Sequence, residues 1–275
     1  MHQLNNVTLF CIDDVQPVNA FGLLFDQTNK LQFGSAKLFT SIEALNRDIN
    51  DPDKNKKYHK LLERAKESKT EINIITETPE IKSLNDYSKF IINKVHHYID
   101  SDFAMCIQMD GYPLAPSKWD PQFLMYDYIG APWTWAAPIA PGDCPEGRCV
   151  GNAGFSIRSK KLMEALSELN YNPENGDSVE DIYICREKGE ELQNLGFKFA
   201  PVELASRFSI ENQPWNGQFG FHGRLTMALS EKNLTNMVFN GPSAENNFTQ
   251  TNLRDFRSIT PRTKFSTSTF STLSL

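Results

Sequence analysis

The stretch FAMCIQMDG, residues 103–111, decides the fold. Residues 103–109 have the length and apolar content of a strand buried on both faces, and they end at Asp110-Gly111. The segment VTLFCI, residues 7–12, has the same character and ends at Asp13-Asp14. Acidic residues after buried strands are expected at the ligand-binding edge of a parallel sheet, because ligands bind beyond the carboxyl ends of such strands.

Outward from this stretch, segments with strand and helix patterns alternate along the chain. Further strands are predicted at 36–40, 71–76, 150–157, 197–201 and 205–210. Helices are predicted at 17–24, 53–68, 87–98, 160–169 and 179–188. This alternation predicts an α/β fold with a mixed, mostly parallel sheet flanked by helices.

Composition limits the classes of protein that fit. The chain has 275 residues, of which 40% are hydrophobic, enough for one large domain over residues 1–240. Residues 241–275 are rich in Ser, Thr and Asn and are predicted to be a tail. The net charge of -6 and the lack of a Lys/Arg block argue against nucleic acid as a partner.

Neither a signal peptide nor a membrane span is expected. The first residues are polar, and no apolar run approaches the roughly 20 residues that a spanning helix needs. We therefore expect a soluble, cytoplasmic protein without stable membrane insertion. Cys144 and Cys149 bracket the loop CPEGRC, and whether they form a disulfide is left open.

Several residues have both a structural and a chemical interpretation. Asp110 fits an ordinary Asp-Gly turn, or it supplies an oxygen ligand to a hard divalent cation. Glu180-Asp181 opens a predicted helix, where the helix dipole stabilises carboxylates, or it provides a general base. His222, in the string FGFHG, is either a packed core residue or a ligand held where glycines permit close backbone approach.

Two further segments have a binding interpretation. The string GNAG, residues 151–154, has glycines spaced for close backbone approach, but it is not the dinucleotide fingerprint GxGxxG. Trp133 and Trp135 lie in an aromatic, Pro- and Gly-rich loop, where their rings either stack on sugars or pack in the core. The loop 134–149 is a candidate lid.

In this order, the motifs resemble a family of largely uncharacterised glycosyltransferases of the GT-A type. The resemblance runs from about Val7 to Gly223 and rests on these strings: QMDGY (108–112), YDYIGAPW (126–133), VGNAGFSIRS (150–159), ED (180–181) and FGFHG (219–223). It extends more distantly to inverting galactosyltransferases. The resemblance implies a GT-A fold and transfer of a sugar from a nucleoside-diphosphate donor, UDP by default, to a glycan or other hydroxyl acceptor.

The resemblance also implies roles by position. Asp110 and His222 correspond to ligands of a divalent metal, Mn2+ or Mg2+, and Asp181, with Glu180 beside it, corresponds to the catalytic base. Donor-binding positions are Asp13, Asp14, Gly151, Asn152, Ala153 and Gly154. Acceptor-binding positions are Trp133 and Trp135. One position departs from the family pattern, since Gln108 replaces the first acidic residue of a DxD motif and leaves metal dependence in question.

The predicted mechanism is a single displacement that inverts the anomeric carbon, with Asp181 deprotonating the acceptor hydroxyl. A non-catalytic protein that binds glycans or nucleotide sugars on the same fold is the alternative. A metal-dependent phosphoesterase or nucleotidyltransferase fits less well, because such two-metal sites need more clustered carboxylates. A purely structural protein would leave the ordered motifs unexplained.

Overall fold

The computed structural model describes residues 2–133 and 149–227, all within one compact unit. The predicted tail 241–275 and most of the candidate lid lie outside these residues, as do Trp135 and Cys144. Where described, the chain contains no helix long and apolar enough to cross a membrane.

The strands are β1 (Gln3–Ile12), β2 (Gln32–Phe39), β3 (Ile72–Ile75), β4 (Phe103–Cys106), β5 (Gly111–Pro113), β6 (Tyr128–Ile129), β7 (Ala131–Pro132), β8 (Val150–Gly151), β9 (Ser156–Ser159) and β10 (Gly220–His222). The α-helices are α1 (Pro17–Lys30), α2 (Ile42–Ile49), α3 (Pro52–Ala65), α4 (Leu84–Asn93), α5 (Lys160–Ser167), α6 (Glu180–Ile182), α7 (Gly189–Asn194) and α8 (Val202–Phe208). Shorter turns are the 3-10 segments η1 (Val95–Tyr98), η2 (Pro116–Lys118), η3 (Pro121–Met125) and η5 (Pro173–Asn175) and the π-helical segment η6 (Tyr183–Glu187).

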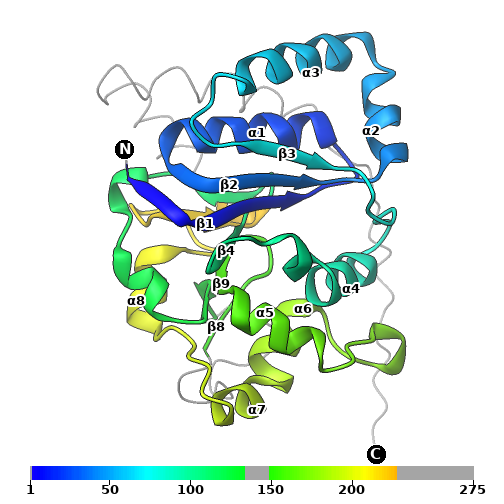
Figure 1. The fold of residues 1–275 in the computed structure, drawn as a ribbon. Helices are drawn as coiled ribbons and strands as arrows, with labels where there is room; N and C mark the ends of the chain where they lie inside the picture. Colours follow the sequence, from blue (N-terminus) through cyan, green and yellow to red (C-terminus); the bar gives the residue numbers. More distant parts are fainter. Residues whose placement is uncertain (1, 134–148, 228–275) are drawn as a thin grey trace, which may run out of the picture. The chain divides into compact units, whose positions relative to one another are not determined.

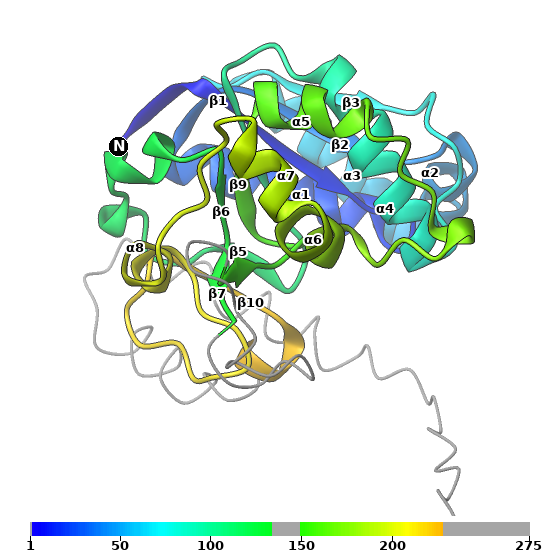
Figure 2. The same cartoon turned by 90° about the horizontal axis from the view of Figure 1, so that it is seen from below.

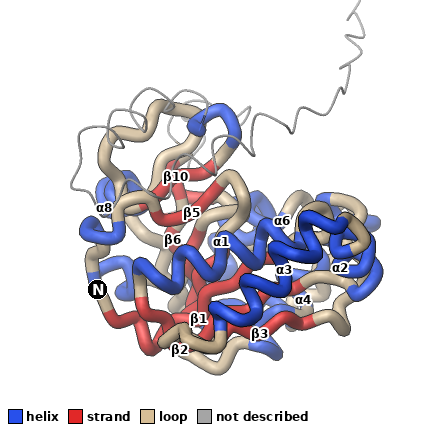
Figure 3. The backbone as a smooth tube through the Cα atoms, turned by 90° about the horizontal axis from the view of Figure 1, so that it is seen from above, coloured by secondary structure: helices blue, strands red, loops and turns tan. Residues whose placement is uncertain are grey.

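A six-stranded sheet forms the centre, in the order β3-β2-β1-β4-β9-β6. The neighbours from β3 to β4 are parallel, whereas β9 runs antiparallel to both β4 and β6. Helices α1 and α3 cover one face and α4, α5 and α6 the other (Figures 1, 2 and 3). The predicted mixed, mostly parallel α/β sheet is therefore confirmed.

Local sequence explains the first half of the fold. The buried run of β1 has apolar residues facing both layers, as expected of a strand covered on both sides. Helix α1 begins with Pro17, where a missing N–H costs nothing. Ser41, Asp51 and Ser83 cap the next three helices through side-chain oxygens that accept backbone N–H groups.

The second half differs from the sequence prediction in three places. The strand predicted at 197–201 is reduced to an isolated bridge between Phe199 and Tyr128. The strand predicted at 150–157 is interrupted, and residues 152–155 form a turn between β8 and β9. The strand predicted at 205–210 is wrong, because residues 202–208 form helix α8. Leu204, Ala205 and Phe208 are buried there, so a helical apolar stripe had been interpreted as strand alternation.

Two small antiparallel pairs extend from the main sheet. β10 pairs with β5, and β7 pairs with β8. Figures 2 and 3 place β5 and β10 together with α8, away from α2 and α3. Because β5 follows β4 closely in the chain, this pair carries the late FGFHG segment to the carboxyl end of a central strand.

Candidate functional site

The candidate site begins where β4 ends. Gln108 and Gly111 exchange backbone hydrogen bonds of 2.8 and 3.0 Å, which turn the chain at Asp110. The β5–β10 register places His222 opposite Gly111, and the Gly223 N–H donates to the Asp110 carbonyl at 2.7 Å. Asp110 and His222, distant in sequence, are thus brought together as the prediction required.

The orientation of His222 is fixed by a carboxylate. Its Nδ1 lies 3.0 Å from Oε1 of Glu211, on the segment that pairs beside β10. Burial lowers the pKa of His222, whereas the hydrogen bond to Glu211 and the charge of Asp110 raise it. The raising effects together are larger, so the pKa of His222 lies above its ordinary value. Glu211 therefore supports His222 by both hydrogen bonding and charge.

Glycine is required at two positions around this imidazole. A Cβ on Gly154 would lie 2.2 Å from His222 Nε2 and 2.3 Å from Gln108 Oε1. A Cβ on Gly111 would lie 2.6 Å from His222 Cδ2. Nε2 of His222 and the amide oxygen of Gln108 therefore both lie against Gly154. A side chain at that position would collide with them.

The loop 151–154 is held in an unusual conformation. Asn152 has a φ of 90°, in the left-handed region that few non-glycine residues adopt. Its Oδ1 accepts the N–H groups of Gly154 at 3.0 Å and Phe155 at 3.3 Å, and its carbonyl accepts the hydroxyl of Tyr128 at 3.0 Å. These bonds explain why the predicted strand is interrupted here.

Asp181 is tied to this loop. Its Oδ2 accepts the Asn152 N–H at 3.0 Å, and its Oδ1 accepts the Ile182 N–H at 2.9 Å. Burial raises the pKa of Asp181, while the two backbone N–H groups oppose the increase. The side chain is only partly buried, so a carboxylate with raised basicity lies beside the glycine loop and within reach of solvent.

Glu180 has a different environment from its neighbour. It is 1% exposed and forms an ion pair with Arg158, which is also 1% exposed. Burial raises the pKa of Glu180 to about 7, and the Arg158 guanidinium opposes this. Because a guanidinium keeps its proton, Glu180 is held as its counter-ion and is shielded from solvent. Of the predicted pair, Asp181 is the accessible carboxylate.

Arg158 connects the pair to the glycine loop. Its guanidinium donates to the Ala153 carbonyl at 3.4 Å and lies 5.5 Å from the centre of the Tyr128 ring. Sequence reasoning assigned no role to Arg158 or to Glu211. For Arg158, the available signal was its position directly after the predicted strand 150–157, whereas the partner of Glu211 is visible only from the strand register.

The acidic pair after β1 is engaged by the backbone. Oδ1 of Asp13 accepts the N–H groups of Val15 and Gln16 at 2.8 and 2.6 Å. Asp14 is buried, and its carboxylate accepts three donors: the Thr40 hydroxyl and the N–H groups of Ser41 and Ile81. Their assignment to donor binding stays a prediction, and their present partners give both residues a structural role.

Trp133 packs directly against the glycine loop. A Cβ on Gly151 would lie 1.8 Å from its ring, and the guanidinium of Arg186 lies 5.2 Å from the ring centre. Trp133 is 9% exposed, so its contact with an acceptor stays a prediction.

Few side chains at this site could bind a metal, but those present are of kinds that bind divalent cations. Among residues 2–133 and 149–227, no group of three or more His, Cys, Asp or Glu is arranged to hold a metal. Asp110 offers a partly exposed carboxylate, 3.9 Å from Arg224 Nε, and Nε2, beside Gly154, is the ring nitrogen of His222 that does not face Glu211. Metal-binding histidines usually have such a carboxylate partner, and Mg2+ at phosphate sites commonly uses few protein ligands.

Comparison with known proteins adds one family. Residues 69–226 match the model of a family described as "Protein of unknown function (DUF5672)". The match includes Asp110, the glycine loop, Glu180-Asp181, Glu211 and His222. No curated protein matches the chain.

Proposed function

The chain belongs to this family of unknown function, DUF5672, and we propose that it is a GT-A-type glycosyltransferase. It moves a sugar from a nucleoside-diphosphate donor, UDP by default, to an acceptor hydroxyl. The sheet order β3-β2-β1-β4, followed by the antiparallel β9, supports the fold assignment. It places the proposed site beyond the carboxyl end of a central strand.

One observation carries the proposal. Asp110, the His222–Glu211 pair and the glycine loop 151–154 meet at the end of β4, and the loop is hydrogen-bonded to Asp181. A nucleotide-sugar transferase needs this combination: groups for a charged diphosphate, a backbone that a sugar can approach closely, and a base for the incoming hydroxyl.

In this proposal, Asp110 and His222 hold Mn2+ or Mg2+, and Glu211 fixes the imidazole so that Nε2 faces the ligand. The cation, when bound, neutralises charge that develops on the diphosphate leaving group. Gly151, Asn152, Ala153 and Gly154 lie against the donor sugar. Asp181 accepts the proton of the acceptor hydroxyl.

The two carboxylates of the ED pair divide their roles. Glu180 neutralises Arg158 and fixes the start of α6, so Asp181 alone is available for proton transfer. One base and direct attack give a single displacement, and we expect inversion at the anomeric carbon. Proton transfer by a positioned base contributes about 10²–10⁴-fold to such reactions.

A non-catalytic protein that binds nucleotide sugars is the second candidate. Gln108 favours it, because its amide oxygen stands where an acidic side chain would bind a cation more strongly. The two candidates differ in turnover: both bind nucleotide, but only the transferase releases nucleoside diphosphate from a nucleotide sugar.

The test is thermal unfolding of the protein with nucleoside diphosphates and nucleotide sugars, each with Mn2+, Mg2+ or EDTA, followed by an assay for released diphosphate. A ligand at about 100 times its Kd stabilises the folded state by roughly 2.7 kcal/mol. We expect a metal-dependent increase in Tm with one nucleotide, and slow release of that nucleotide from its sugar conjugate. A well-folded protein that responds to no nucleotide would contradict both candidates.

A further inference from the structure

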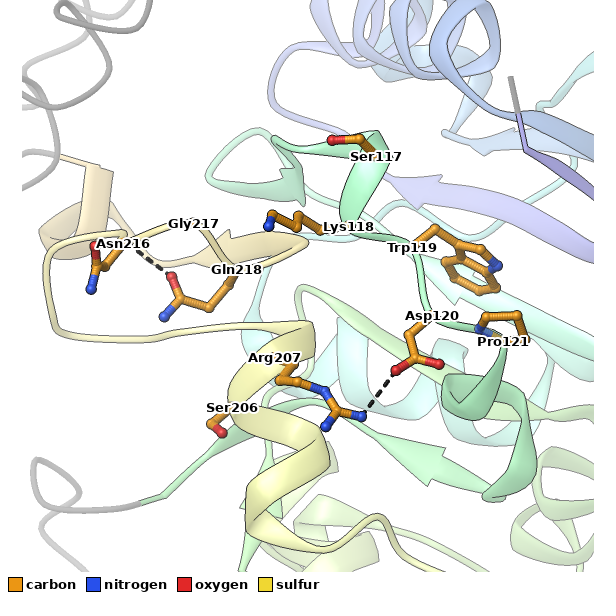
Figure 4. Close-up of a pocket in the computed structure, with 10 residues that line it drawn as sticks. All are labelled: Ser117, Lys118, Trp119, Asp120, Pro121, Ser206, Arg207, Asn216, Gly217 and Gln218. Carbon is orange, nitrogen blue, oxygen red and sulfur yellow. Dashed lines mark hydrogen bonds and ion pairs between the residues drawn. The ribbon is translucent and has the colours of Figure 1, made fainter.

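A second pocket lies at the other end of the β5–β10 pair. It has a volume of about 470 Å3, within the range of ligand pockets. Three segments line it: the η2–η3 turn, the end of α8 and the loop 216–218 (Figure 4). The Leu114 N–H donates to the Phe219 carbonyl, and this hydrogen bond ends the β5–β10 pair next to the pocket. Along the other strand of the pair, residues 219–221 separate Gln218 of this pocket from His222.

The walls of the pocket are fixed without a ligand. The indole N–H of Trp215 donates to the Gln218 carbonyl at 3.0 Å, and the Asn216 N–H donates to Gln218 Oε1 at 2.9 Å. Beneath the opposite wall, the Trp119 ring packs edge-on against Phe219, with centroids 5.4 Å apart. A preformed pocket loses less entropy when it binds a ligand.

The lining combines apolar and polar groups in equal parts, and its charged side chains give a local positive charge, although the whole chain has a net charge of -6. Asp120 pairs with Arg207 at 2.9 Å. Lys118 is exposed and extends toward the loop 216–218 (Figure 4). One carboxylate therefore faces two cations. The amide side chains of Asn216 and Gln218 add groups that hydrogen-bond neutral hydroxyls.

We propose that this pocket binds an anionic saccharide, with Lys118 and Arg207 facing its carboxylate or phosphate and Asn216 and Gln218 its hydroxyls. Resting on the proposed glycosyltransferase function, it is the subsite for the part of the acceptor that extends away from the reacting hydroxyl. The β5–β10 pair connects the two sites, so a ligand bound in the pocket is positioned relative to Asp110 and His222.

The four tryptophans allow both sites to be observed at once. In protein labelled with 15N-tryptophan, the indole signals of Trp119 and Trp215 report on the pocket, and that of Trp133 reports on the glycine loop. Trp→Phe variants assign the signals. Glucuronic acid, glucose 6-phosphate, glucose and inorganic phosphate are titrated separately, without nucleotide.

We expect the two anionic sugars to shift the Trp119 and Trp215 signals, with weaker binding as salt increases. Glucose and inorganic phosphate should bind at least tenfold more weakly. The two anionic sugars distinguish a carboxylate from a phosphate. Lys118→Glu should weaken anionic sugars at least tenfold, whereas Lys60→Ala, at an exposed position on α3, should not.

Equal binding of glucose, equal binding of inorganic phosphate, or no shift at Trp119 and Trp215 would overturn the proposal. So would unchanged affinity in Lys118→Glu. The Trp133 signal is read separately with nucleotide and Mn2+. Failure of the glycosyltransferase proposal would therefore leave Trp133 unshifted by nucleotide while the pocket signals still respond to sugars.

Discussion

The carboxyl ends of β1 and β4 are neighbours in one parallel pair, yet their acidic residues are used in opposite ways. After β1, the Asp14 carboxylate accepts three protein donors and joins the ends of β1, β2 and the chain near Ile81. After β4, the Asp110 carboxylate remains partly exposed, and the ring of the nearby His222 is oriented by Glu211. The same pattern of strand followed by aspartate thus gives a structural junction in one place and a candidate ligand site in the other.

Comparing stability at the two ends tests this contrast most directly. Asp14→Ala should lower the free energy of unfolding by about 3 kcal/mol, because three donors, two of them buried, lose a charged acceptor. Asp110→Ala is the matched control and should change it by only about 0.5 kcal/mol. Denaturant unfolding measures both, and equal losses in the two variants would remove the distinction.

Beside the β4 end, we expect the opposite result: a substitution at Asp181 should reduce activity and leave stability almost unchanged. Asp181→Asn should reduce sugar transfer by about 100-fold or more, since an amide cannot accept the proton. Nucleotide binding and Tm should change little, because Asn keeps an acceptor for the Asn152 N–H. Initial rates of nucleoside diphosphate release provide the measurement. A near-native rate would exclude Asp181 as the base.

The glycine loop provides a steric test at the β4 end. Gly154→Ala would place its Cβ 2.2 Å from His222 Nε2, so the ring or the loop must move. We expect a loss of about 2 kcal/mol in unfolding free energy, typical of overpacking, and loss of metal-dependent nucleotide binding.

The matched glycine control is Gly22→Ala in α1, where the nearest atom would be at an ordinary 3.6 Å. It should be neutral or stabilise the protein by about 0.5–1 kcal/mol. Comparable destabilisation of both variants would mean that close approach to His222 is not the cause.

The smallest expected effect concerns Glu211. Glu211→Gln keeps a hydrogen-bonding group beside His222 Nδ1 but removes the charge, and it should weaken Mn2+-dependent nucleotide binding by about tenfold. Calorimetry with and without Mn2+ measures this coupling. Gln218→Glu, in the second pocket, is a control that changes charge elsewhere and should leave the coupling intact.

The parallel part of the fold was accessible from sequence because long apolar runs and helix caps are local signals. Strands at 7–12, 36–40, 71–76 and 103–109 were each predicted close to their observed positions. The second half depends on tertiary contacts. The turn at Asn152 needs the Tyr128 hydroxyl from a separate strand, and no local pattern predicts that bond.

The candidate site was predictable only in part. Asp110 follows a buried strand and was visible from the pattern, whereas its pairing with His222 came from the family resemblance. Glu211 and Arg158 were missed because their partners are set by strand register and burial. The same limit explains Asp13 and Asp14, whose backbone partners cannot be identified before the chain is folded.

The hydrogen bond from the Asn152 N–H to Asp181 makes proton affinity depend on backbone conformation. With the bond in place, the N–H group favours the ionised carboxylate. If the loop withdrew, the pKa of Asp181 would rise further, because one of the two N–H groups that oppose the effect of burial would be lost. Linkage is reciprocal, so the protonation state of Asp181 contributes equally to the free energy of moving the loop. A ligand that rearranges residues 151–154 would thereby change the proton affinity of Asp181.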